Sequence, residues 1–309
     1  MKRYTQKDLR QLYDDVPQEL QDRVRRTLSF LPETDRQQPR MNQRFRVGLT
    51  AAVLTLVCLV TAAFATGTIQ KWLYPFQYTL LDDGTAEILR YNGSDESVVI
   101  PDMIDEHPVT RIGHKAFYQC HSVQEAVIPE GVTEIGSMAF AECTSLKAVS
   151  IPATVTMIES YAFIHCQSLA DIQIPDSVEL IGYGVFGFCY SLRSVRLPEQ
   201  ITVIYRDLFT SCHALENVEI PASVTVIGAN AFSLCESLTD LILPEGLTAI
   251  HQYAFGQCTG LRELVIPAGV KEIDKYAFLS CRNLRLIVAK GSAAAEFCRE
   301  NGMNYKELP

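Results

Sequence analysis

Eight cysteines recur at a fixed interval of 23 residues and are the first candidates for chemistry. They are Cys120, Cys143, Cys166, Cys189, Cys212, Cys235, Cys258 and Cys281. Zinc sites use cysteine pairs a few residues apart, which this spacing does not provide. Stacked repeats would bring neighbouring cysteines within disulfide range, yet stacking in register points their side chains the same way. We therefore predict a column of buried, unreactive thiols, with disulfides as the alternative.

The six histidines show no ligand spacing. His165 and His213 lie beside cysteines, but the residues at equivalent repeat positions are mixed, so we interpret both as scattered surface residues. No nucleophile elbow, H-E-x-x-H pair or phosphate-binding loop is present in the sequence. The sequence therefore predicts no catalytic residue, no cofactor, no metal and no enzyme.

The cysteines belong to a repeat that dominates the chain from about residue 112 to 284. Each cysteine follows a phenylalanine by three residues, and each phenylalanine follows an isoleucine by five. A fixed period of this length is typical of a solenoid, in which each repeat packs on its neighbours. The predicted repeat core includes Ile135, Phe140, Cys143, Ile158, Phe163, Cys166, Ile181, Phe186, Cys189, Ile227, Phe232 and Cys235.

One repeat unit runs from Leu146 to Cys166. A short strand ends at Pro152, a second extended piece contains Ile158, and Tyr161 to Cys166 is predicted to form one helical turn. Its apolar side chains offer about 1.5–3 kcal/mol each, whereas ordering the backbone costs about 1–2 kcal/mol per residue. A repeat is therefore stable only against its neighbours. The predicted fold class is a leucine-rich-repeat-like solenoid, α/β, with short strands and single helical turns, plus an N-terminal transmembrane helix.

The repeat reads L-x-x-V-x-I-P-x-x-V-x-x-I-G-x-x-A-F-x-x-C-x-x-L. This pattern resembles the BspA-like family of bacterial leucine-rich repeat proteins over about residues 100–290. The resemblance implies a bacterial, surface-exposed or secreted protein with a binding or adhesion role. The glycine after isoleucine is replaced in four repeats by Glu159, Tyr205, His251 and Asp274, so that position cannot require positive φ.

Charge is divided unevenly along the chain. Residues 1–46 carry a net charge of +4 (11 Lys/Arg against 7 Asp/Glu) and residues 67–309 carry −13 (16 against 29). The acidic part argues against nucleic acid. Residues 47–66 are uncharged and long enough to cross a bilayer, and the arginines before them predict a cytoplasmic N-terminus. A signal peptide cleaved after Ala65 is the alternative, although 46 preceding residues are too many for one.

These patterns predict six segments. They are a cytoplasmic tail with short amphipathic helices (1–46), a transmembrane helix (47–66), a juxtamembrane linker (67–75), an N-terminal hairpin cap (76–100), an eight-repeat solenoid (101–290) and a C-terminal cap of helix and strand (291–309). Apolar residues at three- and four-residue spacing in 5–31 indicate a partly ordered tail or a docking site for a cytoplasmic protein.

Solvent-facing columns are where a solenoid could recognise a partner. Two acidic columns, a threonine column and exposed tyrosines are candidates, although each also fits an ordinary solvated face. The candidate binding residues are Glu125, Asp171, Asn217, Asp240, Glu263, Asp176, Glu199, Glu245, Tyr183 and Tyr205, and the threonines are Thr110, Thr133, Thr156, Thr202, Thr225 and Thr248.

The sequence thus predicts a single-pass membrane protein, anchored by 47–66, whose extracellular repeats bind protein or glycan partners without catalysis. The alternative is a transmembrane sensor in which the repeats regulate a cytoplasmic protein bound by residues 5–31.

Overall fold

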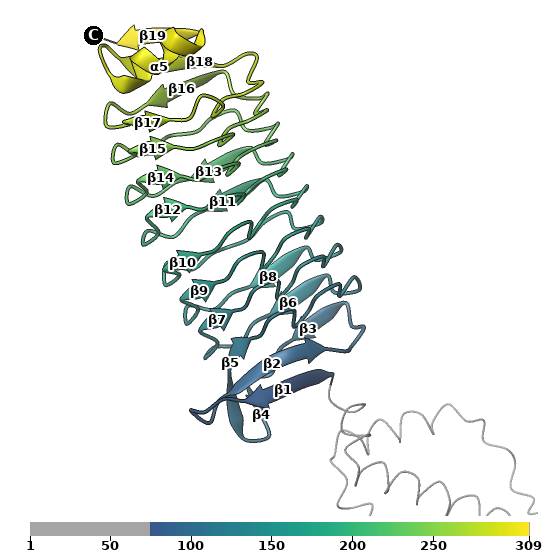
Figure 1. Cartoon of the computed structure of the whole chain (residues 1–309). Coiled ribbons are helices and arrows are strands. Elements are labelled where there is room, and N and C mark those ends of the chain that lie inside the picture. Colours follow the sequence, from purple (N-terminus) through teal and green to yellow (C-terminus); the bar gives the residue numbers. More distant parts are fainter. Residues whose placement is uncertain (1–74, 309) are drawn as a thin grey trace, which may run out of the picture. The chain divides into compact units, whose positions relative to one another are not determined.

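The structure, a computed structural model, describes residues 75–308 (Figure 1). The described residues belong to one compact unit of the chain. A continuous apolar core runs from Ala86 to Cys298, so we expect this unit to fold on its own. Within the described residues no helix has the length and apolar composition to cross a bilayer. The predicted tail, membrane span and linker lie outside the described residues.

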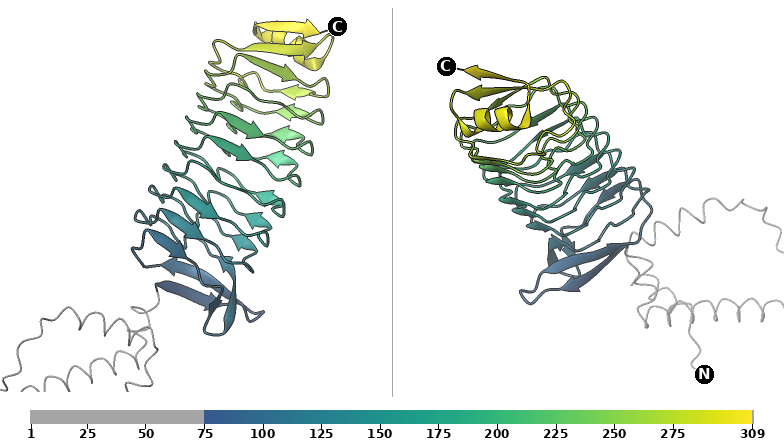
Figure 2. Two further views of the ribbon diagram at one scale, coloured as in Figure 1. Left: turned by 180° about the vertical axis from the view of Figure 1, so that it is seen from behind. Right: turned by 45° about the horizontal axis from the view of Figure 1, so that its top comes forward.

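The coils of the solenoid carry parallel strands on two sides, as Figure 2 shows. On the first, here called the Ile side, the inward residue of each strand is the repeat isoleucine. Its strands are β5 (His107–Ile112), β7 (Glu134–Ile135), β9 (Met157–Ile158), β10 (Leu180–Ile181), β12 (Val203–Ile204), β14 (Val226–Ile227), β15 (Ala249–Ile250) and β17 (Glu272–Ile273). On the second, the Val side, the strands are β3 (Ser97–Val99), β6 (Glu125–Val127), β8 (Ala148–Ser150), β11 (Ser194–Arg196), β13 (Asn217–Glu219), β16 (Glu263–Ile266) and β18 (Arg285–Ala289).

Phenylalanine rings form a ladder through the core. From Phe117 to Phe278, successive ring centroids lie 4.6 to 5.9 Å apart, and successive rings are within 21° of parallel. The predicted core residues are all buried, at 2% exposure or less. Each coil therefore shares its apolar side chains with both neighbours, as a solenoid requires.

The predicted helical turn from Tyr161 to Cys166 is wrong. The chain instead makes tight turns in which N–H groups donate to the next coil, as Phe140 does to Ala162 (2.7 Å) and Glu142 to Ile164 (2.8 Å). A helical turn would direct these groups along its own axis. The turns place residues two before and two after the phenylalanine in the left-handed region: Lys115, Gln119, Met138, Glu142, Tyr161, His165, Gly184, Phe188, Asp207, Ser211, Asn230, Leu234, Tyr253, Gln257 and Ser280.

Left-handed backbone at these non-glycine residues is a source of strain that substitution can remove. Gln257 has a φ of 60° and an exposed side chain. A non-glycine residue in this region costs about 1–2 kcal/mol, part of which glycine returns as unfolded-state entropy. We expect Gln257→Gly to raise the free energy of unfolding by about 0.5–1 kcal/mol and Gln257→Ala to leave it unchanged, as measured by urea denaturation. Equal midpoints for the two variants would show that the turn is not strained.

The N-terminal end is covered by a hairpin, as the sequence predicted. The strands β1 (Phe76–Leu80) and β2 (Ala86–Tyr91) pair antiparallel around Asp82-Asp83-Gly84, and β2 then pairs parallel with β5. A tight hairpin leads from β4 (Met103–Ile104) into β5, because Asp105 and Glu106 both take positive φ (47° and 68°).

The C-terminal end is covered by α5 (Ala293–Asn301) and β19 (Tyr305–Leu308). Ser292 is the N-cap, with its hydroxyl accepting from the Ala295 N–H (3.2 Å), and Gly302 ends the helix with a φ of 63°. The last strand, β19, pairs parallel with β18 from Tyr305 to Leu308. On the Ile side β17 pairs only with β15 among the described strands.

Candidate binding surface

The cysteine column is a structural element. Seven thiols donate a hydrogen bond to the phenylalanine carbonyl of the preceding coil, with Sγ–O distances of 2.9 to 3.3 Å. All nine cysteines of the described residues are free, so no disulfide forms between coils. Burial raises the pKa of the Cys189 thiol to about 12, which keeps it protonated and unreactive at neutral pH. These thiols are donors to backbone oxygens and offer neither a nucleophile nor a metal ligand.

The acidic candidates lie on the Val side and on the loops that follow its strands. All eight are exposed: Glu125, Asp171, Asn217, Asp240, Glu263, Asp176, Glu199 and Glu245. Arg196 contacts both Asp176 (2.9 Å) and Glu199 (3.5 Å), and Arg285 pairs with Glu263. None of the other five has an ion-pair partner among the described residues, and only Asp240 and Glu245 share a coil. This arrangement is typical of a solvated face with exposed ion pairs.

Hydroxyl groups of the threonine column donate hydrogen bonds to backbone carbonyls. Hydroxyls of Thr133, Thr156 and Thr225 donate to the threonine carbonyl of the preceding coil at 3.3 Å, and the Thr248 hydroxyl does so at 2.9 Å. Each of these hydroxyls therefore supports the stacking of coils. The column is a structural feature of the Ile side.

The structure brings the two candidate tyrosines together. The rings of Tyr183 and Tyr205 meet edge to face, with centroids 5.2 Å apart. The Arg206 guanidinium lies 5.7 Å from the Tyr183 ring and 3.1 Å from the Asp207 carboxylate. Within residues 107–273, the ladder of strands on the Ile side is interrupted once, between β10 and β12. The tyrosine pair lies across this junction. The two tyrosines thus form an aromatic cluster at the surface, and the positive charge of Arg206 beside them is balanced by Asp207.

Beside the tyrosines runs a row of apolar side chains that the sequence analysis did not single out. Strand residues alternate between the two faces of the sheet, so the residue before each buried isoleucine lies on the outer face. Tyr205 lies two residues after Val203 and is therefore on the same face. Leu180 is 37% exposed, Met157, Val203 and Val226 are half-buried, and Ala249 at the C-terminal end of the row is buried, at 7% exposure. No element of the described chain covers the row (Figure 1). We call it the apolar stripe: Met157, Leu180, Val203, Val226 and Ala249.

Charged residues bound the apolar stripe at both ends. Glu134 precedes it and pairs with Arg111 at 3.2 Å, and Glu272 follows it on β17. On the Val side, by contrast, the apolar residues at the outward position fall near the two ends and are separated by four polar ones, Ser150, Gln173, Arg196 and Glu219. Five successive apolar residues before the repeat isoleucine were visible in the sequence, and strand alternation places them opposite the buried isoleucines, although Ala249 is itself buried.

A profile of the BspA type leucine-rich repeat region matches residues 110–239 and 202–293, with six copies in all. The matched residues span more than half of the chain. The chain belongs to the BspA-type leucine-rich repeat family. No curated protein matches it.

Solved leucine-rich repeat proteins resemble the BspA-type solenoid described above. The crystal structure of a leucine-rich repeat protein of T. pallidum is 30% identical, with 75% of this chain and 95% of that chain aligned and a TM-score of 0.56. A leucine-rich cell surface protein of Faecalibacterium prausnitzii A2-165 is 22% identical over 76% of this chain and 93% of that chain, with a TM-score of 0.40. The first of these supports the repeat fold.

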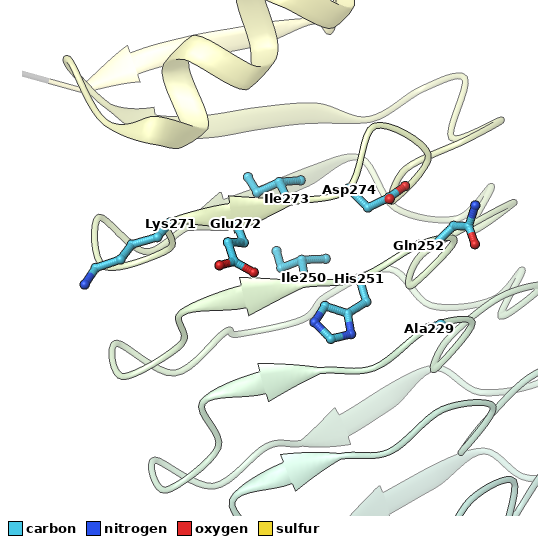
Figure 3. Close-up of a pocket in the computed structure, with 8 residues that line it drawn as sticks. All are labelled: Ala229, Ile250, His251, Gln252, Lys271, Glu272, Ile273 and Asp274. Atoms are coloured by element: carbon cyan, nitrogen blue, oxygen red, sulfur yellow. The ribbon is translucent and has the colours of Figure 1, made fainter.

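A shallow cavity of about 550 Å³ lies at the C-terminal end of the BspA-type coils (Figure 3). Lys271 and Gln252 point to opposite sides of it, so its polar groups do not converge on one point. Within residues 75–308 no cluster of His, Cys, Asp or Glu could hold a metal ion. The cavity extends the Ile side and is lined by Ala229, Ile250, His251, Gln252, Lys271, Glu272, Ile273 and Asp274.

His165 and His213 are half-exposed, and each is part of an aromatic stack that the sequence analysis did not predict. His165 stacks on Phe188 with ring centroids 4.4 Å apart, and His213 stacks on Tyr190 at 5.4 Å. Phe188 and Tyr190 meet edge to face, which joins the two pairs. His213 also lies 3.7 Å from Glu236, measured from Nδ1 to Oε1. Each stacked pair is one repeat period apart, which is the signal that the sequence offered.

Proposed function

We propose that this chain is a membrane-anchored, extracellular recognition module that binds a protein partner without catalysis. The observation that carries the proposal is the apolar stripe beside the Tyr183–Tyr205 pair, on a sheet face that no described element covers. The stripe is a partly exposed apolar surface, with Leu180 at 37% exposure and Met157, Val203 and Val226 half-buried. Apolar surface that is contiguous marks interaction sites, and tyrosine is enriched at binding hot spots. The uncharged run 47–66 and the arginines before it support the anchor and the orientation.

A protein partner fits the apolar stripe better than a glycan does. Aliphatic side chains such as Leu180 and Val203 gain free energy by excluding water from other apolar surface. A glycan presents hydroxyl groups, which need polar partners that this row lacks. The acidic columns would serve to keep the molecule soluble and to attract basic partners over a distance.

Site-specific photocrosslinking in intact cells tests this function. A photoreactive residue at Leu180 is expected to give a covalent protein adduct, while the same residue at Val265 on the Val side, 56% exposed, is expected to give none. External protease should digest the repeats of intact cells and leave an internal control protein uncut. Adducts from Val265 alone would place recognition on the other side, and protected repeats would remove the extracellular placement.

A further inference from the structure

The apolar stripe has a spacing that a partner must match. Strands in a sheet lie about 4.8 Å apart, and three of the four steps from Met157 to Ala249 join paired strands. The step from Leu180 to Val203 crosses the junction where the ladder is interrupted. At this spacing the row covers about 19 Å along the solenoid. The row runs across the strands, in the direction in which coils stack. A partner lying along it needs one apolar side chain per step.

An α-helix meets this requirement and an extended strand does not. A helix presents one apolar side chain per turn of 5.4 Å, so its mismatch with the stripe is about 0.6 Å per step and about 2.4 Å over all four steps. An extended strand presents side chains on one face every 6.6–6.8 Å, so it is out of phase by about 2 Å at the first step. The matching helix covers about 13 residues at 1.5 Å each.

Charge around the apolar stripe sets the rest of the partner's chemistry. The acidic residues beside it are Glu159, Glu179, Glu272 and Asp274. Of the nearby basic residues, Arg206 is paired with Asp207 at 3.1 Å, and the Lys275 ammonium lies over the Tyr276 ring, 4.6 Å from its centroid, which leaves Lys271. This excess of acid favours lysine and arginine on the flanks of the bound segment.

We propose that the apolar stripe binds an amphipathic α-helix of a partner protein, three to four turns long, with one apolar face and basic flanks. The proposal rests on the recognition function proposed above and names the chemistry of the partner. It belongs to the mode in which a helix lays an apolar face into a hydrophobic surface. Tyr205 packs along one edge of the helix, and the threonine column borders the other.

The test uses residues 66–309 and three synthetic peptides of about 14 residues with fluorescent labels. The first carries leucines one helical turn apart with lysines between them; the second has the same composition with leucines at every second position; the third replaces lysine by glutamate. We expect the first to bind at least about tenfold more tightly than the other two and to gain helical circular dichroism on binding. Equal affinity for the first two peptides would overturn the helix, and equal affinity for the first and third would overturn the basic flanks.

Variants locate the binding. The double change Leu180→Lys with Val203→Lys should weaken the first peptide by about tenfold or more, whereas Val265→Lys on the Val side should change its affinity by less than about twofold. Tyr205→Ala serves if the double variant does not fold. Self-association of residues 66–309 without peptide would show that the face joins two copies and would overturn the proposal. Adducts from Leu180 in cells combined with no peptide binding would refute the helix and leave the recognition function standing.

Discussion

Raising the pH from 8 to 10 is expected to lower the free energy of unfolding of residues 66–309 by about 10 kcal/mol. In the unfolded chain a thiol ionises at pH 9.0, whereas burial raises the pKa of Cys189 to about 12 and that of Cys281 to about 11. Burial raises the pKa of the other five hydrogen-bonded thiols as well. The native state therefore holds protons that the unfolded state loses above pH 9.

The size of this effect follows from the number of thiols. Each contributes about 1.4 kcal/mol per pH unit between its unfolded and native pKa values, and seven of them stand in the hydrogen-bonded column. The stabilisation is complete below pH 9 and is lost as the pH rises toward 12. A loss of about 10 kcal/mol equals the whole stability of an ordinary domain, so unfolding near pH 10 is expected.

Urea denaturation at several pH values measures the effect, with thiolate ultraviolet absorbance as a second probe. Replacing Cys189 and Cys212 by alanine should lower the stability at neutral pH and reduce the pH dependence by two protons of the seven. Cys298 lies in α5 outside the column, and burial raises its pKa to about 11, so Cys298→Ala should remove one further proton from the pH dependence. A free energy of unfolding that stays constant from pH 8 to 10 would contradict the predicted shifts.

Phe186→Ala is expected to destabilise the solenoid by about 3–5 kcal/mol. The Phe186 ring is fully buried and lies between Phe163 at 5.9 Å and Phe209 at 5.7 Å, so its removal leaves a cavity and ends both stacks. Because coils are stabilised only by their neighbours, the loss in a central coil should also uncouple the two halves. Calorimetry should then show two transitions where the unmodified protein shows one.

Two further variants are controls for Phe186→Ala. Phe188→Ala removes the same side chain from the same turn at a half-buried position, and its cost should stay within about 1 kcal/mol. Phe186→Leu fills most of the cavity and should cost about 1–2 kcal/mol. If Phe186→Ala and Phe188→Ala had equal effects, the phenylalanine ladder would not be the interior of the molecule.

Repetition in the sequence predicts the interior well, because identical positions in successive coils must meet. Ile135, Phe140 and Cys143 were predicted as core from the 23-residue period, and they are fully buried. The period also predicts which cysteines align, but it does not show that a thiol donates to a carbonyl such as that of Phe117. That bond depends on the path of the turn, which the pattern leaves open.

The turn itself could not be predicted from local propensity. Its left-handed positions hold residues as different as Lys115, Met138, Tyr161 and Asp207, since the hydrogen bonds to the next coil determine the backbone there. Local preference alone suggested a helical turn. The apolar stripe was missed for a related reason: whether Leu180 faces inward or outward depends on the register of a two-residue strand, which burial of Ile181 decides.

The ladder bonds between coils have a mechanical consequence. They run along the length of the solenoid, from each coil to the next, so a pull between its two ends loads them in series. Under such tension the coils should peel away one at a time from an end, each releasing 23 residues, or about 80 Å of contour length. A cell that holds one end and a partner that holds the other would be joined by a tether that yields stepwise.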